Sequence, residues 1–219
     1  MEFRVAERFG GQMNQKALSF FQQHYAPGRI GLVGARDAVG MLIRNGQRGL
    51  TADGNASKWS HTFIFGDRRN DGRSDGSIYI FESDLRVDPK HWQVLNGAME
   101  SRVVKWCGDE IDNACVLGMN LTPQETSRIV SEGLRLAYDD QHLQYPVGEL
   151  FGTLLAILTG RMGRRNVFDD RYAVQCATYV RMTYQVIGKD PLTGETHISN
   201  TSPEKLYQST KFTFRQMMS

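Results

Sequence analysis

The sequence predicts an α+β protein, a single domain in which a small, mainly antiparallel sheet packs against helices. Three observations support this prediction. Short apolar segments of strand type are interspersed with amphipathic segments of helical period. The composition, 40% hydrophobic and 23% charged over 219 residues, is ordinary for a globular protein. The chain contains no internal repeat or long linker, so we expect one domain over residues 1–219.

In the first half of the chain, apolar positions over residues 12–25 predict an amphipathic helix that Pro27-Gly28 terminates, within an N-terminal helical extension of residues 1–26. The elements expected next are a strand over 30–33, a brief helix over 38–43, a polar loop over 47–58, a strand over 59–65, a hairpin turn within 67–77 and a strand over 78–81 that ends in Glu82.

In the second half, strands are expected over 102–106 and 115–119. Thr122-Pro123-Gln124-Glu125 forms a capping box and predicts a helix to Tyr138. Its expected buried positions are Ile129, Val130, Leu134 and Ala137. The remaining expected elements are an apolar helix over 147–158, a helix over 169–187 closed by Gly188, a short helix opening at Ser202-Pro203 and an edge strand over 211–214.

Composition and cysteine count limit the function classes. The net charge of +2 gives no reason to expect a nucleic-acid partner. Cys107 and Cys115 flank what looks like a hairpin tip, so a disulfide across two strands and two unpaired thiols both remain open. No histidine is suitably spaced for a structural zinc site, and no metal is expected.

The longest apolar run, residues 150–158, is too short to span a bilayer, so no stable membrane span is expected. This segment either packs beneath the helix that carries Cys176 or forms a lid or a membrane-touching element. The N-terminus lacks an apolar signal core. We therefore expect cytoplasmic synthesis, with any export to a periplasm carried out by a dedicated secretion machine or directed by a leader absent from this chain.

Two distant segments suggest nucleophilic catalysis by a thiol. Cys176 falls in the first turn of a predicted helix, where the positive helix end favours a thiolate. His61 begins a predicted strand on which Trp59, His61 and Phe63 would share one face. A histidine of this kind could act as the base for the thiol. The alternative is a buried core cysteine and an ordinary hydrogen-bonded histidine.

The ordered set of segments resembles the circularly permuted branch of the NlpC-like, papain-fold cysteine hydrolases, which is related to lecithin:retinol acyltransferase-like proteins. The matching segments are Gly28 to Val33, Ala38 to Arg44, Trp59 to Ile64, Ile80 to Ser83, Tyr145 to Leu155, Gln175 to Val180 and Ser202 to Leu206. The sequence departs from the family pattern at Arg29, Ala177 and Thr178, and retains the cysteine and the histidine.

The resemblance implies a permuted papain-like fold in which Cys176 is the nucleophile and His61 the base. Glu82 is the expected group that orients His61, with Asp67 and Asp84 as rivals. The backbone N–H of Cys176 would meet the oxyanion, with Gln175 or Tyr145 as a second donor, and Trp59 would line the substrate groove or lie in the core.

The expected activity is hydrolysis of amide bonds by a cysteine peptidase or amidase that needs no cofactor. The most plausible substrate is the peptide of bacterial peptidoglycan, and such a chain could be an antibacterial effector or toxin, for which an immunity or inhibitor protein is an open partner. Two alternatives are a lipid acyltransferase or thioesterase of the same fold and a non-catalytic binding module.

Overall fold

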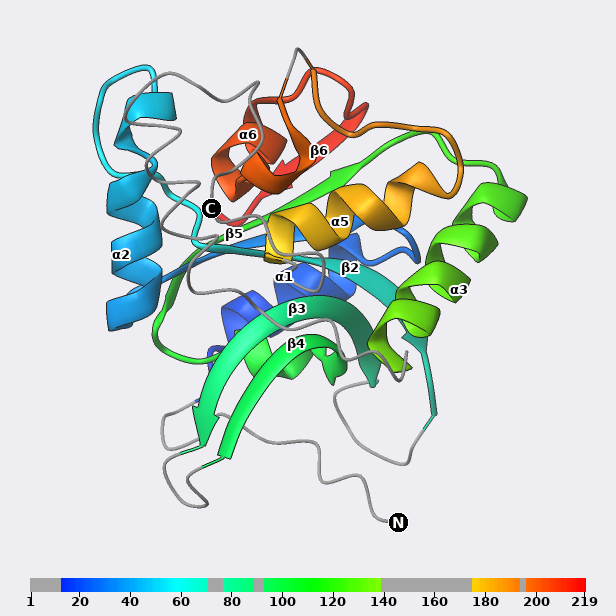
Figure 1. The fold of residues 1–219 in the computed structure, drawn as a ribbon. Helices are drawn as coiled ribbons and strands as arrows, with labels where there is room; N and C mark the ends of the chain where they lie inside the picture. The colour runs from blue at the N-terminus through cyan, green and yellow to red at the C-terminus, as the bar shows by residue number, and fades with distance from the viewer. Residues whose placement is uncertain (1–12, 71–76, 89–92, 139–174, 194–195) are drawn as a thin grey trace.

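The computed structural model describes residues 13–70, 77–88, 93–138, 175–193 and 196–219 (Figure 1). Six strands form one antiparallel sheet in the order β4-β3-β2-β1-β5-β6. Their bounds are β1 Ile30–Ala35, β2 His61–Arg68, β3 Ile78–Asp88, β4 Gln93–Arg102, β5 Ile111–Gly118 and β6 Phe214–Met217. The predicted α+β class, with a mainly antiparallel sheet packed against helices, is confirmed.

Helices lie on both sides of this sheet. The described α-helices are α1 Gln15–His24, α2 Ala38–Gly46, α3 Pro123–Tyr138, α5 Cys176–Gln185 and α6 Pro203–Gln208. Short 3-10 turns are η1 Arg48–Leu50, η2 Val103–Trp106 and η3 Ile198–Asn200. Figure 1 shows α3 and α5 in front of the sheet and α1 behind it.

The alternation of side chains along the strands produces two cores. On β2, Ile64 belongs to the cluster shared with α3 and α5, whereas Phe63 and Phe65 belong to the cluster shared with α1. Phe21 of α1 packs edge-on against Phe63, with ring centroids 5.7 Å apart. The sheet is therefore buried on both faces, and its central strand β1 is buried along its whole length.

Two buried tyrosines of α5 fix that helix on the sheet. The hydroxyl of Tyr179 donates to the carbonyl of Gly133 in α3 at 2.8 Å, and that of Tyr184 donates to the carbonyl of Gly28 at 2.5 Å. Gly28 lies just before β1, so these bonds connect α5 to both a neighbouring helix and the sheet. The helix that begins with Cys176 is thus held in place along its length.

Most expected elements of the first half are present. The helices expected over 12–25 and 38–43 are α1 and α2, and the strands expected over 30–33 and 59–65 are β1 and β2. The 47–58 loop contains only the short turn η1. The residues of the expected turn numbered 71–76 lie outside the described part of the chain.

The capping box at the start of α3 is confirmed. Glu125 N–H donates to Thr122 Oγ1 at 3.2 Å, and Thr122 N–H donates to Glu125 Oε2 at 2.9 Å. Ser202 caps α6, and Gly188, with φ of 71°, follows the end of α5 as expected. The helix expected over 147–158 lies outside the described residues, as do 169–174 and Tyr145.

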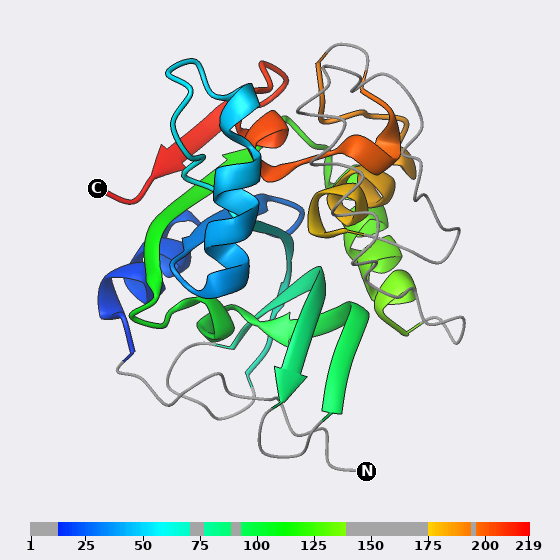
Figure 2. The same cartoon turned by 60° about the vertical axis from the view of Figure 1, so that its left-hand side comes forward.

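The strand expected over 102–106 is wrong. Arg102 is the last residue of β4, residues 103–106 form the turn η2, and most of β4 was not expected as a strand. β3 and β4 pair without interruption from Tyr79↔Arg102 to Asp88↔Gln93 and run side by side as a curved hairpin (Figure 2). β3 therefore continues past Glu82, which lies inside the strand and not at its end. Pairing between the two strands overrides the weak local strand signal of the polar β4 segment.

The expected hairpin between Cys107 and Cys115 is also absent. β5 pairs with β1 and β6, and the residues before it form η2. Cys107 and Cys115 are buried and belong to different core clusters. Of the two states left open by the sequence, the structure has the one without a disulfide between them.

Two further burial predictions need correction. Leu134 is 40% exposed, because the buried stripe of α3 runs through Ile129, Gly133 and Leu136, whereas Val130 and Ala137 are partly buried. Trp59 does not share a strand face with Phe63: it precedes β2 and lies in the other core cluster.

The position of Gly133 generates a test of how α3 packs on the sheet. A Cβ at residue 133 would lie 2.6 Å from Cδ2 of the buried Phe81 ring. Glycine to alanine in a helix ordinarily adds about 1 kcal/mol of stability. For Gly133→Ala we expect instead a loss of about 1–3 kcal/mol, because the overpacked helix must move off Phe81. Urea unfolding measures this difference.

Ser131→Ala is the matched control, because residue 131 is exposed on the same helix. We expect its free energy of unfolding to change by less than about 0.5 kcal/mol. A stabilised Gly133→Ala variant would contradict the described contact between α3 and β3.

Candidate functional site

Cys176 is the first residue of α5. Gln175 has the extended backbone of an N-cap residue, with φ of −70° and ψ of 158°, so the helical conformation starts at the cysteine. The first N–H groups of a helix have no acceptor within the helix, and they make this end positive. The expectation that the thiol lies in the first turn of a helix is confirmed. Cys176 is 3% exposed.

His61 is the first residue of β2 and pairs with Val33 of β1. The residue before it fixes the start of the strand: Ser60 N–H donates to the carbonyl of Val33 at 2.8 Å, and Ser60 Oγ accepts from Ala35 N–H at 2.9 Å. The imidazole stacks on Trp106 of η2, with ring centroids 4.3 Å apart and planes 23° apart. His61 is 6% exposed.

A buried polar network holds the backbone that leads into His61. Ser57 Oγ donates to Glu204 Oε2 at 2.6 Å and accepts from Trp59 N–H at 3.0 Å. The amide of Gln47 donates to the carbonyl of Trp59 at 2.8 Å and accepts from Glu204 N–H at 2.9 Å. Residues far apart in sequence, in the 47–58 loop and in α6, thus fix where β2 begins.

Glu82 of β3 lies next to His61. Its side chain is fully buried, and Oε2 lies 2.8 Å from His61 Nε2. The same oxygen accepts from the indole Nε1–H of Trp106 at 2.8 Å, and Oε1 accepts from Lys105 Nζ at 2.6 Å. A buried carboxylate needs such donors, because an unpaired charge away from water is costly. The contact between Glu82 and His61 is the one expected of an orienting acid.

Two neighbours of Glu82 were not among the expected site residues. Lys105, with its side chain 5% exposed, also forms an ion pair with Asp84, at 2.7 Å from Oδ2. Lys105 and Trp106 belong to the segment that the sequence predicted as a strand, which would have placed their side chains on opposite faces of the sheet. Only the turn η2 lets both reach Glu82, so no local pattern could identify them.

The charges in this cluster shift two ionisation equilibria. Burial opposes a charge on His61, but the charge and hydrogen bond of Cys176, together with those of Glu82, raise the pKa of His61 to about 10. Burial would raise the pKa of Glu82, but Lys105 and His61 hold it well below its usual range. Because Glu82 occupies Nε2 of the ring, Nδ1 is the nitrogen that remains for the sulfur of Cys176.

The other expected site residues have different outcomes. Trp59 is fully buried beside Tyr207, with ring centroids 5.0 Å apart, and within the described part of the chain its Nε1–H has no hydrogen-bond partner. Gln175 is buried next to Cys176. Asp67 is exposed, and Asp84 contacts Lys105, so Glu82 is the acid beside His61. Tyr145 lies outside the described residues.

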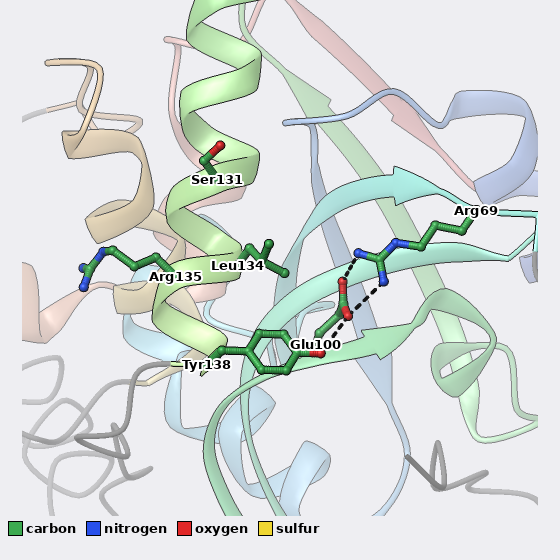
Figure 3. A pocket seen from close by; sticks show the side chains of 6 residues that line it. All are labelled: Arg69, Glu100, Ser131, Leu134, Arg135 and Tyr138. Atoms are coloured by element: carbon green, nitrogen blue, oxygen red, sulfur yellow. Dashed lines mark hydrogen bonds and ion pairs between the residues drawn. The ribbon is translucent and has the colours of Figure 1, made fainter. Parts of the chain in front are cut away.

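A separate pocket of about 530 Å³ lies between α3, β4 and Arg69, which follows β2 (Figure 3). Glu100 of β4 pairs with Arg69 and accepts from the hydroxyl of Tyr138 at 3.0 Å. The lining residues are Arg69, Glu100, Ser131, Leu134, Arg135 and Tyr138. None of the residues expected at the thiol site lines this pocket, and its charged groups are paired with one another or with α3.

Within the described ranges, no group of three or more His, Cys, Asp or Glu side chains could hold a metal ion. No described helix is both long and apolar enough to cross a bilayer.

Neither a protein-family model nor a curated protein matches the sequence. Among solved structures, the chain is similar to the metalloprotein YiiX (DUF1105) from Escherichia coli O157:H7, with a TM-score of 0.53 and 13% sequence identity. The match covers 85% of this chain and 94% of that chain. At this identity the similarity concerns the fold alone.

The burial of Glu82 generates a prediction about pH and stability. The pKa of Glu82 is lower in the folded protein than in the unfolded chain, where it is about 4.3. The ionised carboxylate therefore stabilises the fold at pH values above about 4.3, and this stabilisation is lost as the pH falls further. For Glu82→Gln we expect a loss of about 3–5 kcal/mol at neutral pH, because Lys105 and His61 lose their buried counter-ion. The difference from wild type should narrow below about pH 4.5.

Urea unfolding from neutral to acidic pH measures this difference. Glu132→Gln is the control, because Glu132 makes a surface i,i+3 pair with Arg135 and should change stability by less than about 1 kcal/mol at any pH. If the difference in free energy of unfolding between wild type and Glu82→Gln stayed constant with pH, it would contradict the lowered pKa assigned to Glu82.

Proposed function

We propose that the protein is a cysteine hydrolase that cleaves amide bonds through an acyl-enzyme on Cys176. The observation that carries the proposal is the 2.8 Å contact between Glu82 Oε2 and Nε2 of a buried imidazole, His61, whose pKa is raised by the charge and hydrogen bond of Cys176 together with those of Glu82. A nucleophile hydrogen-bonded to a base, which a third group orients, is the arrangement used by nucleophilic enzymes on unrelated folds.

The first half of the proposed reaction forms the acyl-enzyme. The Cys176 thiolate attacks the substrate carbonyl carbon, a C–S bond forms, and the carbonyl electrons move to the oxygen. The backbone N–H of Cys176, at the positive end of α5, is placed to donate to that oxyanion. As the C–N bond breaks, the His61 imidazolium gives its proton to the leaving amine.

The second half releases the acid. Neutral His61 takes a proton from water while the water oxygen attacks the thioester carbon. The C–S bond then breaks, which returns the thiolate and the imidazolium and frees the carboxylic acid. Glu82 holds the ring through Nε2 in both halves and supports the imidazolium. The net reaction is an amide and water giving a carboxylic acid and an amine.

For the substrate we propose the peptides of bacterial cell wall, with action in a periplasm as an antibacterial effector. This part rests on the resemblance to permuted NlpC-like hydrolases and on the shared thiol chemistry. An immunity or inhibitor protein would be the matching partner. The same acyl-enzyme could transfer an acyl group from a lipid, so phospholipid belongs in the experiment as a second substrate.

Thiol labelling tests the nucleophile without a known substrate. We expect iodoacetamide at about pH 7 to label Cys176 far faster than an ordinary thiol, whose pKa of about 8.5 leaves few thiolates. His61→Ala should slow this labelling by at least tenfold, because the imidazolium that stabilises the thiolate is lost. Peptide mass spectrometry identifies the labelled residue.

The other two cysteines are internal controls. Burial raises the pKa of Cys115 to about 12, with a smaller opposing influence from Arg215, and Cys107 is fully buried. Both should label only after unfolding. Because Cys176 is itself 3% exposed, slow labelling of all three thiols in the native protein would mean that the sulfur is inaccessible and would remove the catalytic proposal.

Turnover is tested by mass spectrometry of muropeptides after incubation of purified peptidoglycan with the protein. We expect a defined hydrolysis product that Cys176→Ala abolishes, with the fold retained because the change is small. Glu82→Gln should slow turnover less than His61→Ala, since an orienting group contributes less than the base.

Phospholipid vesicles serve as the parallel substrate. If acyl groups were released from the vesicles and the muropeptides were unchanged, the proposed peptidase activity would be wrong. The protein would then be an enzyme that acts on lipid acyl groups through the same thiol chemistry. Full activity of Cys176→Ala on either substrate would rule out the mechanism.

A further inference from the structure

The buried lysine next to Glu82 has no part in the bond-making steps above. Lys105 lies in η2, and its ammonium contacts carboxylates on two positions of β3, Glu82 at 2.6 Å and Asp84 at 2.7 Å. A fully buried ammonium is rare in proteins, because burial without partners is costly. We therefore ask what its two buried ion pairs do for the neighbouring site.

The two oxygens of the Glu82 carboxylate bind different partners. Oε1 accepts from Lys105, and Oε2 accepts from His61 and Trp106. With one oxygen fixed by the ammonium, the carboxylate cannot rotate away from the imidazole. The backbone of η2 places Lys105 and Trp106 together, so both the carboxylate and the stacked ring of His61 are held by one turn.

Asp84 holds Lys105 from the other side. Its Oδ2 makes the ion pair at 2.7 Å, but within the described part of the chain this atom has no partner with hydrogen-bond geometry. The interaction is therefore one of charge. The order of contacts is Asp84, Lys105, Glu82 and His61, and carboxylates alternate with basic groups along it.

We propose that Lys105 is a positioning residue that keeps Glu82 ionised and aligned against His61, and thereby sets the lower pH limit of thiol chemistry at Cys176. The functional part of this inference rests on the proposed hydrolase mechanism. The groups that act on Glu82 are Lys105 from η2 and His61 from β2, with Tyr179 of α5 as a weaker electrostatic neighbour. The charge of Lys105 is the largest single influence that favours the ionised form of Glu82.

The indole N–H of Trp106 reports directly on this carboxylate, because it donates to Glu82 Oε2. The experiment follows the ¹⁵N–¹H signal of that indole from about pH 8 to about pH 4, a window that contains the ordinary pKa of a glutamate. Trp106→Phe assigns the signal. In wild type we expect it to be flat across the window, since Glu82 stays ionised.

In Lys105→Met we expect the signal to titrate, with a midpoint inside the pH window over which the wild-type signal is flat. Lys105→Arg retains the charge and should restore the flat profile. Lys189→Met is the matched control, because Lys189 makes a 2.8 Å ion pair with Glu125 away from the site and should leave the indole signal unchanged. A flat profile in Lys105→Met would overturn the inference.

The second readout is the rate of iodoacetamide labelling of Cys176 in the same samples. Because Glu82 supports the imidazolium that stabilises the thiolate, labelling in Lys105→Met should fall with the same midpoint as the indole signal. In Glu82→Gln, adding Lys105→Met should change the labelling profile no further. If Lys105→Met changed the labelling profile as much in Glu82→Gln as in wild type, Lys105 would act on the fold and not through Glu82.

These outcomes separate the two proposals. An indole titration shifted in Lys105→Met, with no turnover of peptidoglycan or vesicles by wild type, would retain the ionic role of Lys105 and remove the hydrolase. Rapid labelling of Cys176 that depends on His61 but is unaffected by Lys105→Met would remove the ionic role of Lys105 and retain the hydrolase proposal. If Lys105→Met does not fold, Lys105→Gln replaces it, since its amide can still donate to Oε1. Failure of both to fold while Glu82→Gln folds would also overturn the inference.

Discussion

The structure around the candidate site depends on the burial of one carboxylate. Glu82 has no exposed side-chain surface, and it is tolerated there because Lys105, His61 and Trp106 all donate to it. Removing water from a carboxylate costs several kcal/mol, so each donor must be held within hydrogen-bonding distance. Donors from β2 and η2 therefore meet at a single charge on β3.

Further contacts hold the elements around this carboxylate in place. β3 is held by its long pairing with β4 and by β2, and η2 follows directly from β4. The approach to His61 is fixed by the buried network of Gln47, Ser57 and Glu204. α5, which presents Cys176, is bonded through its tyrosines to α3 and to the entry of β1. Preorganisation of this kind is what the nucleophile of the proposed mechanism would require.

The arrangement also assigns different roles to its ionisable groups. Glu82 is kept ionised, so it can support the His61 imidazolium but is a poor acceptor of its proton. His61, whose pKa is raised to about 10, is the group that would carry the proton between thiol, leaving group and water in the proposed mechanism. Environments that push the pKa values of neighbouring groups apart are a feature of acid–base sites.

Local sequence determined the elements whose signals are carried by adjacent residues. The capping box at Thr122 and Glu125, the start of α6 at Ser202-Pro203 and the first-turn position of Cys176 could all be predicted, because each depends on the backbone chemistry of a few neighbouring residues. The pairing of His61 with Glu82 was expected from the resemblance and from the order of two strands.

The tertiary structure alone decided the rest. The polar strand β4 exists because β3 offers it a partner, and that pairing ends where η2 begins. Only then do Lys105 and Trp106 turn toward Glu82. Contacts between residues more than twenty positions apart depend on strand pairing and on how the chain turns between strands, and no local pattern of residue types encodes them.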